Sequence, residues 1–175
     1  DHRDLPSFPT RRSSDLQQDT VTFRHLVREL ALPFRQVTAE ERAQAAAAAE
    51  KYRDNPAERW RFNWNQSVVT RFEAQRGKVP EPYRMELHVL RLGDCAIATN
   101  DFELYTDFGQ QMKGRSPAVQ TFVIQLAGPG GYVPTARAAA NGGYGAVIQS
   151  SRLGPDAGQQ LVDATVAAWQ ELWRK

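Results

Sequence analysis

Glu103 is the residue whose type and position bear most directly on chemistry. It lies in the stretch NDFELYTDFG, residues 100–109, directly after an apolar run. Asn100 precedes it by the spacing of a helix capping box, which favours a structural glutamate bonded to the backbone. Its position favours another role, because a carboxylate that follows the end of a strand lies where layered α/β proteins bind ligands. A helix cap and a metal ligand are therefore both open interpretations of Glu103.

Two tyrosines in a glycine-rich segment are the next candidates. The segment GPGGYVPTARAAANGGYG, residues 128–145, places Tyr132 and Tyr144 each beside glycine. Glycine allows the backbone to come close to another group, so these rings are expected where the chain makes a close approach. The segment lacks the Lys-Ser/Thr ending of a phosphate-binding loop and the GxGxxG pattern of a dinucleotide fold. A flexible surface loop is the alternative interpretation.

The elements before and after Glu103 must position it. Met85, Leu87 and Val89 alternate before the apolar run RLGDCAIAT, which predicts a β-hairpin that turns at Gly93-Asp94. A helix is predicted from about residue 101 to 113, because Gly114 and Pro117 follow as stop signals.

The carboxy-terminal third predicts one more strand and one more long helix. The run AVQTFVIQLAG, residues 118–128, is continuously rich in β-forming residues and predicts a central strand that is buried on both faces. A weak helical turn is expected after residue 135. A last amphipathic helix is predicted from about residue 155 to 173, with Leu161, Thr165, Trp169 and Trp173 on one side.

The amino-terminal third predicts strand followed by two helices. Residues 20–37 alternate in two registers, which is typical of one long strand with a bulge or of two short strands. Thr38 and Glu41 have capping-box spacing before an alanine run, which predicts a helix from about 39 to 53. Asn55 and Pro56 open a second helix in the same way.

The start of that second helix, RWRFNW, alternates arginines with aromatic residues. This composition could form a stacking platform for single-stranded nucleic acid. However, Trp60, Trp64, Val68 and Phe72 recur every four residues, which predicts a buried stripe on one helix face. Core packing is the favoured interpretation, and no nucleic-acid partner is expected.

The composition is that of an ordinary globular domain. The chain has 175 residues, 41% of them hydrophobic, and 22 Lys and Arg against 20 Asp and Glu. The net charge of +2 excludes a strong field toward nucleic acid or anionic lipid. No window approaches the roughly 20 apolar residues of a transmembrane helix. Helices and strands alternate, so the fold class is α/β (layered, mixed α+β), with a mostly buried sheet flanked by helices.

The first residues have a different origin from the rest. SFPTRRSSDL, residues 7–16, resembles the in-frame translation of a sequencing adapter. Residues 1–16 are therefore expected to be an artefact, and residues 17–175 to be the evolved part of the chain.

Several motifs together resemble a known family. They are the Gly-Asp turn at residue 93, the glutamate at 103, the sequence GRSP at 114–117, the YVPT loop and the GGYGA turn. Over roughly Met85 to Trp173, and less strongly at LPFRQVTAEE, the chain is similar to the neutral/alkaline non-lysosomal ceramidases. The similarity is to the carboxy-terminal part of their catalytic domain, in particular in bacterial members, so the chain would be an incomplete half of a larger domain.

The resemblance implies a zinc-dependent amidase that cleaves the N-acyl bond of ceramide-like lipids or of a smaller N-acyl amide. Glu103 matches the family's zinc glutamate, Tyr132 its zinc tyrosine, and Tyr144 an active-site tyrosine that binds the substrate carbonyl or its oxyanion. The two zinc histidines and the catalytic serine belong to the family's amino-terminal portion, so this chain alone is expected to be inactive. A secreted or periplasmic location is implied as well.

A second interpretation belongs to a different class. The same fold could be a non-catalytic scaffold that binds lipid or glycan through the tyrosine loop.

Overall fold

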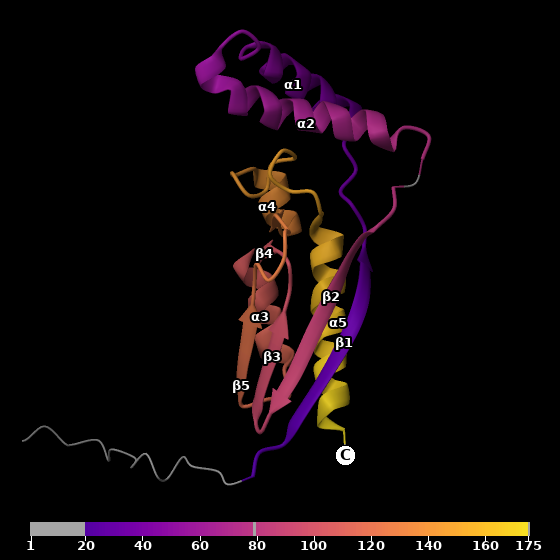
Figure 1. Ribbon diagram of the computed structural model, residues 1–175, viewed down its shortest axis with the longest axis vertical. Helices are drawn as coiled ribbons and strands as arrows, with labels where there is room; N and C mark the ends of the chain where they lie inside the picture. Colours follow the sequence, from indigo (N-terminus) through magenta and orange to yellow (C-terminus); the bar gives the residue numbers. More distant parts are fainter. Residues whose placement is uncertain (1–19, 79, 175) are drawn as a thin grey trace, which may run out of the picture.

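The computed structural model describes residues 20–78 and 80–174. The expected adapter segment, residues 1–16, lies outside the described residues. The elements, labelled in Figure 1, are β1 (Phe23–Leu32), α1 (Ala39–Glu50), η2 (Pro56–Glu58), α2 (Arg59–Gln75), β2 (Tyr83–Leu92), β3 (Cys95–Thr99), β4 (Glu103–Leu104), α3 (Thr106–Arg115), β5 (Gln120–Ile124), β6 (Tyr132–Val133), α4 (Ala136–Asn141) and α5 (Pro155–Trp173).

Four strands form the main sheet in the order β1-β2-β3-β5. β1, β2 and β3 are antiparallel neighbours, and β5 runs parallel to β3. The predicted hairpin is confirmed, with Gly93 at a φ of 58° in its turn. β1 pairs with β2 without interruption, so neither the bulge nor the two short strands occurs. The two apolar registers of the sequence are the two faces of a single strand.

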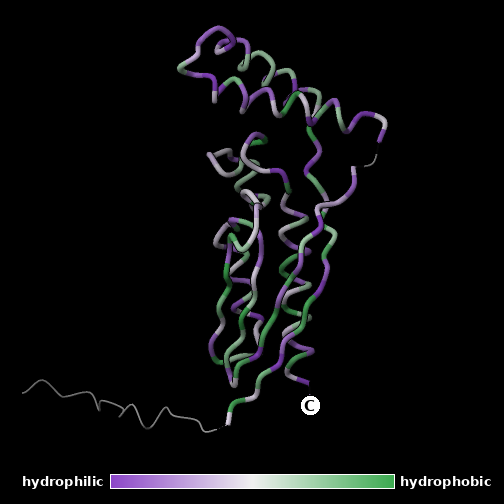
Figure 2. Tube along the Cα trace, in the orientation of Figure 1, coloured by the Kyte–Doolittle hydropathy of each residue, from purple (hydrophilic) through white to green (hydrophobic). Residues whose placement is uncertain are grey.

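The core lies between one face of this sheet and the helices α3 and α5. Met85, Leu87 and Val89 are buried, as predicted from their alternation. Trp169 of α5 is fully buried, and its indole N–H donates to the Ile97 carbonyl at 3.1 Å. Hydrophobic residues accordingly run along α5 and the strands that face it (Figure 2). The mixed sheet flanked by helices, with 44% helix and 23% strand, confirms the α/β fold class.

No helix in the described ranges has both the length and the apolar composition that crossing a bilayer requires.

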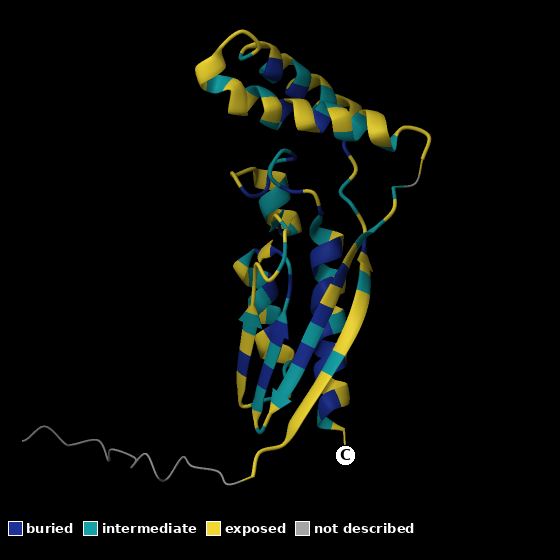
Figure 3. Cartoon of the chain, viewed as in Figure 1, coloured by how far each residue is buried: buried dark blue, intermediate teal, exposed yellow. Residues whose placement is uncertain are grey.

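The other face of the sheet carries apolar side chains that the described residues leave uncovered. Those with 43% to 63% of their surface exposed are Phe23, Val27, Leu92, Phe122 and Ile124. Figure 3 shows how largely β1 is exposed. The prediction of a central β5 buried on both faces is therefore wrong, because β5 is an edge strand with one open face. An apolar run does not reveal whether a second layer covers it.

The helical hairpin α1–α2 stands beyond one end of the sheet (Figure 1). Thr38 and Glu41 form the predicted capping box, with bonds of 3.1 and 2.9 Å between each side chain and the backbone of the other. The side chain of Asn55 accepts from the Ala57 N–H at 3.1 Å and caps the 3-10 helix η2, and α2 follows from Arg59 without a side-chain cap. The predicted start at Thr38 is confirmed, whereas Asn55 and Pro56 open η2 and not α2 itself. A second, smaller core forms here from Val37, Ala45, Val68 and Ile148.

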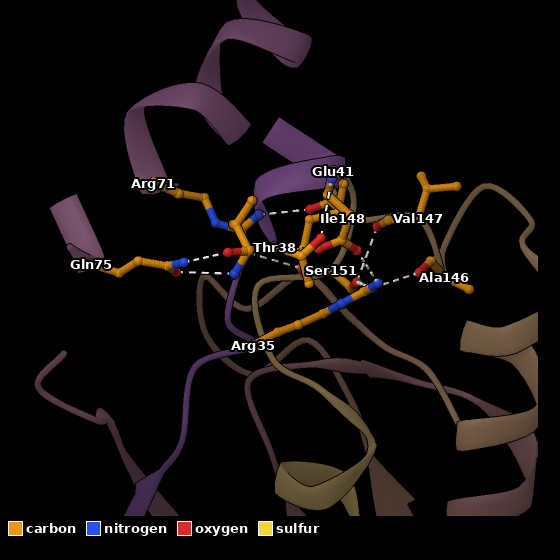
Figure 4. Close-up of polar contacts among 10 residues, drawn as sticks. Arg35, Thr38, Glu41, Arg71, Gln75, Ala146, Val147, Ile148 and Ser151 are labelled. Carbon is orange, nitrogen blue, oxygen red and sulfur yellow. Dashed lines mark hydrogen bonds and ion pairs between the residues drawn. The ribbon is translucent and has the colours of Figure 1, made fainter. Parts of the chain in front are cut away.

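Polar side chains tie this hairpin to the loop that follows α4 (Figure 4). The Gln75 amide bonds to both the N–H and the carbonyl of Val37. Arg35 donates to the Ala146 carbonyl at 2.8 Å, and Arg71 donates to the Ile148 carbonyl at 2.7 Å. The loop that carries Tyr144 is thus held by α2 and by the segment before α1.

The uncovered sheet face is expected to drive self-association of the isolated chain. The double substitution Phe122→Thr/Ile124→Thr removes two half-exposed apolar side chains while keeping β-forming residues. We expect the variant to form oligomers, detected by light scattering, only at a higher concentration than the wild type. Its midpoint of thermal unfolding should not be lower. Val119→Thr, at a position that is 87% exposed but outside the strands, is the control. A wild-type chain that stays monomeric at all concentrations would contradict this expectation.

Candidate active site

Glu103 does not cap a helix. It forms the short strand β4, and α3 begins only at Thr106. The side-chain oxygen of Asn100 accepts from the Phe102 N–H at 2.9 Å, which closes a turn instead of starting a helix. The Glu103 N–H donates to the Gly131 carbonyl at 3.1 Å. The capping interpretation and the helix start near residue 101 are therefore wrong, because Asn100 bonds two residues ahead and the Glu103 backbone pairs with a distant strand.

That distant strand brings Tyr132 beside Glu103. β4 and β6 are parallel, and Glu103 and Tyr132 are direct partners in their register. Partner residues in a ladder project from the same face. The Glu103 carboxylate beside the Tyr132 hydroxyl raises the pKa of Tyr132, and desolvation raises it further. The two residues predicted to share a metal are thus direct neighbours across the ladder.

Glycines make this pairing possible. Gly130 donates its N–H to the Asp101 carbonyl at 3.0 Å. A Cβ at Gly130 would lie 2.4 Å from that same oxygen, and one at Gly128 would lie 2.4 Å from the Asp101 carboxylate. Any side chain would push the loop off the turn at Asp101. The expected close approach is real, and it is made to the chain itself.

Tyr144 lies against the Tyr132 ring. It follows Gly142 and Gly143, whose φ values of 74° and 119° favour glycine. Its ring meets the Tyr132 ring edge-on, with centroids 5.7 Å apart, while 70% of the residue is exposed. All three site residues predicted from the resemblance therefore lie together.

Sequence reasoning missed the aromatic residues that extend this cluster. Trp64 stacks on Tyr144 with centroids 6.2 Å apart and planes 20° from parallel, and Trp60 lies 6.5 Å from Trp64. We call the series Tyr132, Tyr144, Trp64 and Trp60 the aromatic row. The predicted buried stripe is wrong at Trp60, which is 58% exposed. Residues spaced four apart in a helix are displaced around its axis by about 40° per step. Trp60, two steps before Val68, therefore lies on a different side of the helix from that buried residue.

The Glu103 and Tyr132 oxygens suit a metal ion but cannot complete its coordination. Zinc accepts carboxylate oxygen at about 2.0–2.2 Å and binds four ligands in most sites. Within residues 20–78 and 80–174, no group of three His, Cys, Asp or Glu side chains could hold a metal. His25 and His88 stack on each other on β1 and β2, in a different sheet from Glu103. The pair could supply at most two ligands, and any others would have to come from elsewhere.

Comparison with protein-family models, with curated proteins and with solved structures gave no match to this chain. The ceramidase resemblance consequently rests on the sequence motifs alone.

Gly145→Ala tests how tightly the site is packed. The added Cβ would lie 2.8 Å from the Tyr132 ring and 3.2 Å from the Tyr105 ring. We expect a loss of about 1–3 kcal/mol in the free energy of unfolding. A changed near-ultraviolet circular dichroism spectrum should show that the rings have moved. Gly109→Ala, in α3 with open space around it, should instead be neutral or stabilising by about 0.5–1 kcal/mol. Equal effects of the two substitutions would contradict the packing described here.

Tyr83 makes the stability of the folded protein depend on pH. Its hydroxyl donates to the Asp101 carboxylate at 2.7 Å, and burial followed by this bond raises the pKa of Tyr83 to about 12. The pKa of Tyr83 in the folded protein lies above its ordinary value of 10.0, so the neutral hydroxyl contributes fully to stability below pH 10. That contribution is lost as the pH rises toward about 12. Urea unfolding across that range should show a smaller decline for Tyr83→Phe than for the wild type. Parallel curves for the two proteins would contradict the assignment.

Proposed function

We propose that this chain is part of a zinc-dependent amidohydrolase similar to the neutral/alkaline ceramidases. The reaction would be hydrolysis of the N-acyl amide bond of ceramide-like or other N-acyl substrates. The observation that carries the proposal is the direct pairing of Glu103 with Tyr132 across β4 and β6. Residues assigned as two ligands of one ion must lie side by side, and these two do.

Glu103 and Tyr132 would hold the ion through their side-chain oxygens. Bound zinc supplies a water of pKa near 7 and polarises the amide carbonyl. The pairing of β4 with β6 places both side chains on the same face of the ladder. The resemblance assigns the remaining ligands, two histidines, to an amino-terminal portion of the domain.

Tyr144 would bind the substrate carbonyl. Its ring is held between Tyr132 and Trp64, which limits the positions that its hydroxyl can take. A hydroxyl held in this way can donate to the oxyanion that develops on the attacked carbonyl. One such donor contributes about 2.7–4 kcal/mol to the transition state.

The aromatic row supports an apolar substrate. Its first member, Tyr132, is a proposed metal ligand, and its last, Trp60, is largely exposed. Aromatic rings offer flat apolar area at a small cost in conformational entropy. An acyl chain attached to an amide at Tyr144 would lie along Trp64 and Trp60.

Substitutions in the full-length parent protein test the proposal. We expect Glu103→Gln and Tyr132→Phe to lower zinc content and amidase activity together. Tyr144→Phe should lower kcat about 10²–10³-fold while zinc content stays unchanged. Glu81→Gln removes an exposed carboxylate outside the site and is the control. Full zinc content and activity in Glu103→Gln would overturn the assignment, and so would amidase turnover by the isolated chain.

A binding scaffold without catalysis is the second candidate. The exposure of Trp60 and Tyr144 favours it, because large aromatic side chains at the surface commonly contact a ligand. Such a scaffold would bind lipid or glycan through the aromatic row, with no need for Glu103. Ligand binding that survives Glu103→Gln but is lost in Trp64→Ala, in a parent without amidase activity, would favour the scaffold.

A further inference from the structure

Three arginines converge where α2 meets the loop after α4. Arg35 and Arg71 are visible in Figure 4, and Arg152 follows that loop. Only Arg35 has a carboxylate partner, Glu41, at 2.9 Å. Among the described residues, neither Arg71 nor Arg152 forms a salt bridge. The cluster therefore holds three positive charges against one negative charge.

Among the described residues, Arg71 forms hydrogen bonds only to neutral groups. It is half-buried and donates to the carbonyls of Ile148 and Ser151 at 2.7 and 3.4 Å. Burial lowers the pKa of Arg71, the nearby charges of Arg152 and Arg35 lower it further, and the Glu41 carboxylate opposes this lowering in part. Carbonyl dipoles offset only part of the cost of burying a cation, so an anion beside Arg71 would be favoured.

The backbone of Arg152 accepts from the Arg35 N–H at 2.8 Å, while its side chain is exposed. Its guanidinium lies over the Phe34 ring, 5.2 Å from the centroid. Within the described part of the chain, this side chain donates no hydrogen bond. Arg35 and Arg71 have a structural role, because they tie the helical hairpin to the loop. The Arg152 guanidinium has no such role among the described residues.

The three side chains line a cavity of about 140 Å³, together with the amides of Gln36 and Gln75. This volume would hold roughly four water molecules at about 30 Å³ each, which suits a small oxyanion. Arg71 and Arg152 also line a more open hollow of about 540 Å³, which offers a way in from solvent. The lining includes no carboxylate, and of its five polar side chains the Arg152 guanidinium is the one that donates no hydrogen bond within the described residues, since Arg35, Gln36, Arg71 and Gln75 already donate to other groups of the chain.

We propose that this arginine cavity binds an oxyanion group of a ligand, either a phosphate or a carboxylate, through the guanidinium groups of Arg152 and Arg71. A guanidinium presents five N–H donors in a planar fork that matches both groups. The site uses neither Glu103 nor the tyrosines, so it stands or falls independently of the proposed amidase.

Titration of the full chain tests the site. Inorganic phosphate and acetate are added separately at constant ionic strength, with chloride as the balancing ion, and binding is followed by the thermal midpoint and by amide NMR shifts. We expect saturable binding of at least one probe, with shifts centred on residues 34–36, 71–75 and 152. A response to phosphate alone assigns a phosphate-bearing ligand, and a response to acetate alone assigns a carboxylate.

Substitutions give the test its specificity. Arg152→Gln should weaken binding about 10- to 100-fold, the loss expected for a charged hydrogen-bonded contact. Arg152→Lys keeps the charge but not the planar guanidinium fork, so its affinity should lie between those of the wild type and Arg152→Gln. Arg59→Gln makes the same charge change at an exposed position of α2 and should bind like the wild type. Equal weakening in Arg59→Gln, unchanged binding in Arg152→Gln, or no saturable binding to the wild type would overturn the proposal.

Discussion

The pairing of two short parallel strands, β4 and β6, is the constraint on which the site depends. Only two residues of each strand take part, so the ladder itself contributes little stability. What fixes it is the contact between the glycine-rich loop and the turn at Asp101, where the backbone of Gly130 lies too close for any side chain. Tyr83 holds the same turn from the main sheet through Asp101. Loss of this contact would separate Glu103 from Tyr132 and remove the proposed pair of metal ligands.

The second support of the site comes from the helical hairpin. α2 supplies the two tryptophans of the aromatic row, and its other end is bonded through Arg71 and Gln75 to the loop and to the segment before α1. The hairpin thus fixes the Tyr144 loop from both sides, by ring stacking and by hydrogen bonds to carbonyls. This arrangement gives the arginines a structural role, and it also concentrates the positive charge that makes the arginine cavity a candidate anion site.

Local signals predicted much of the fold, and tertiary context decided the rest. The capping box at Thr38, the turn at Gly93 and the period of α5 are encoded within a few residues, so their predictions are confirmed. The exposure of Trp60 and the edge position of β5 depend on what covers them, which no local pattern records. Spacing around Asn100 misled for a related reason, since the partner of Glu103 lies in a strand distant in sequence. The grouping of Glu103 with Tyr132 and Tyr144 was expected from the family resemblance and not from spacing.

The central claim is that one cation is bound jointly by residues 103 and 132. Anomalous diffraction at the zinc edge from zinc-loaded crystals of the full-length parent measures this directly. The account predicts one peak within about 2.0–2.2 Å of both a Glu103 carboxylate oxygen and the Tyr132 phenolic oxygen. A zinc peak bonded to only one of these oxygens, or located away from both, would contradict it.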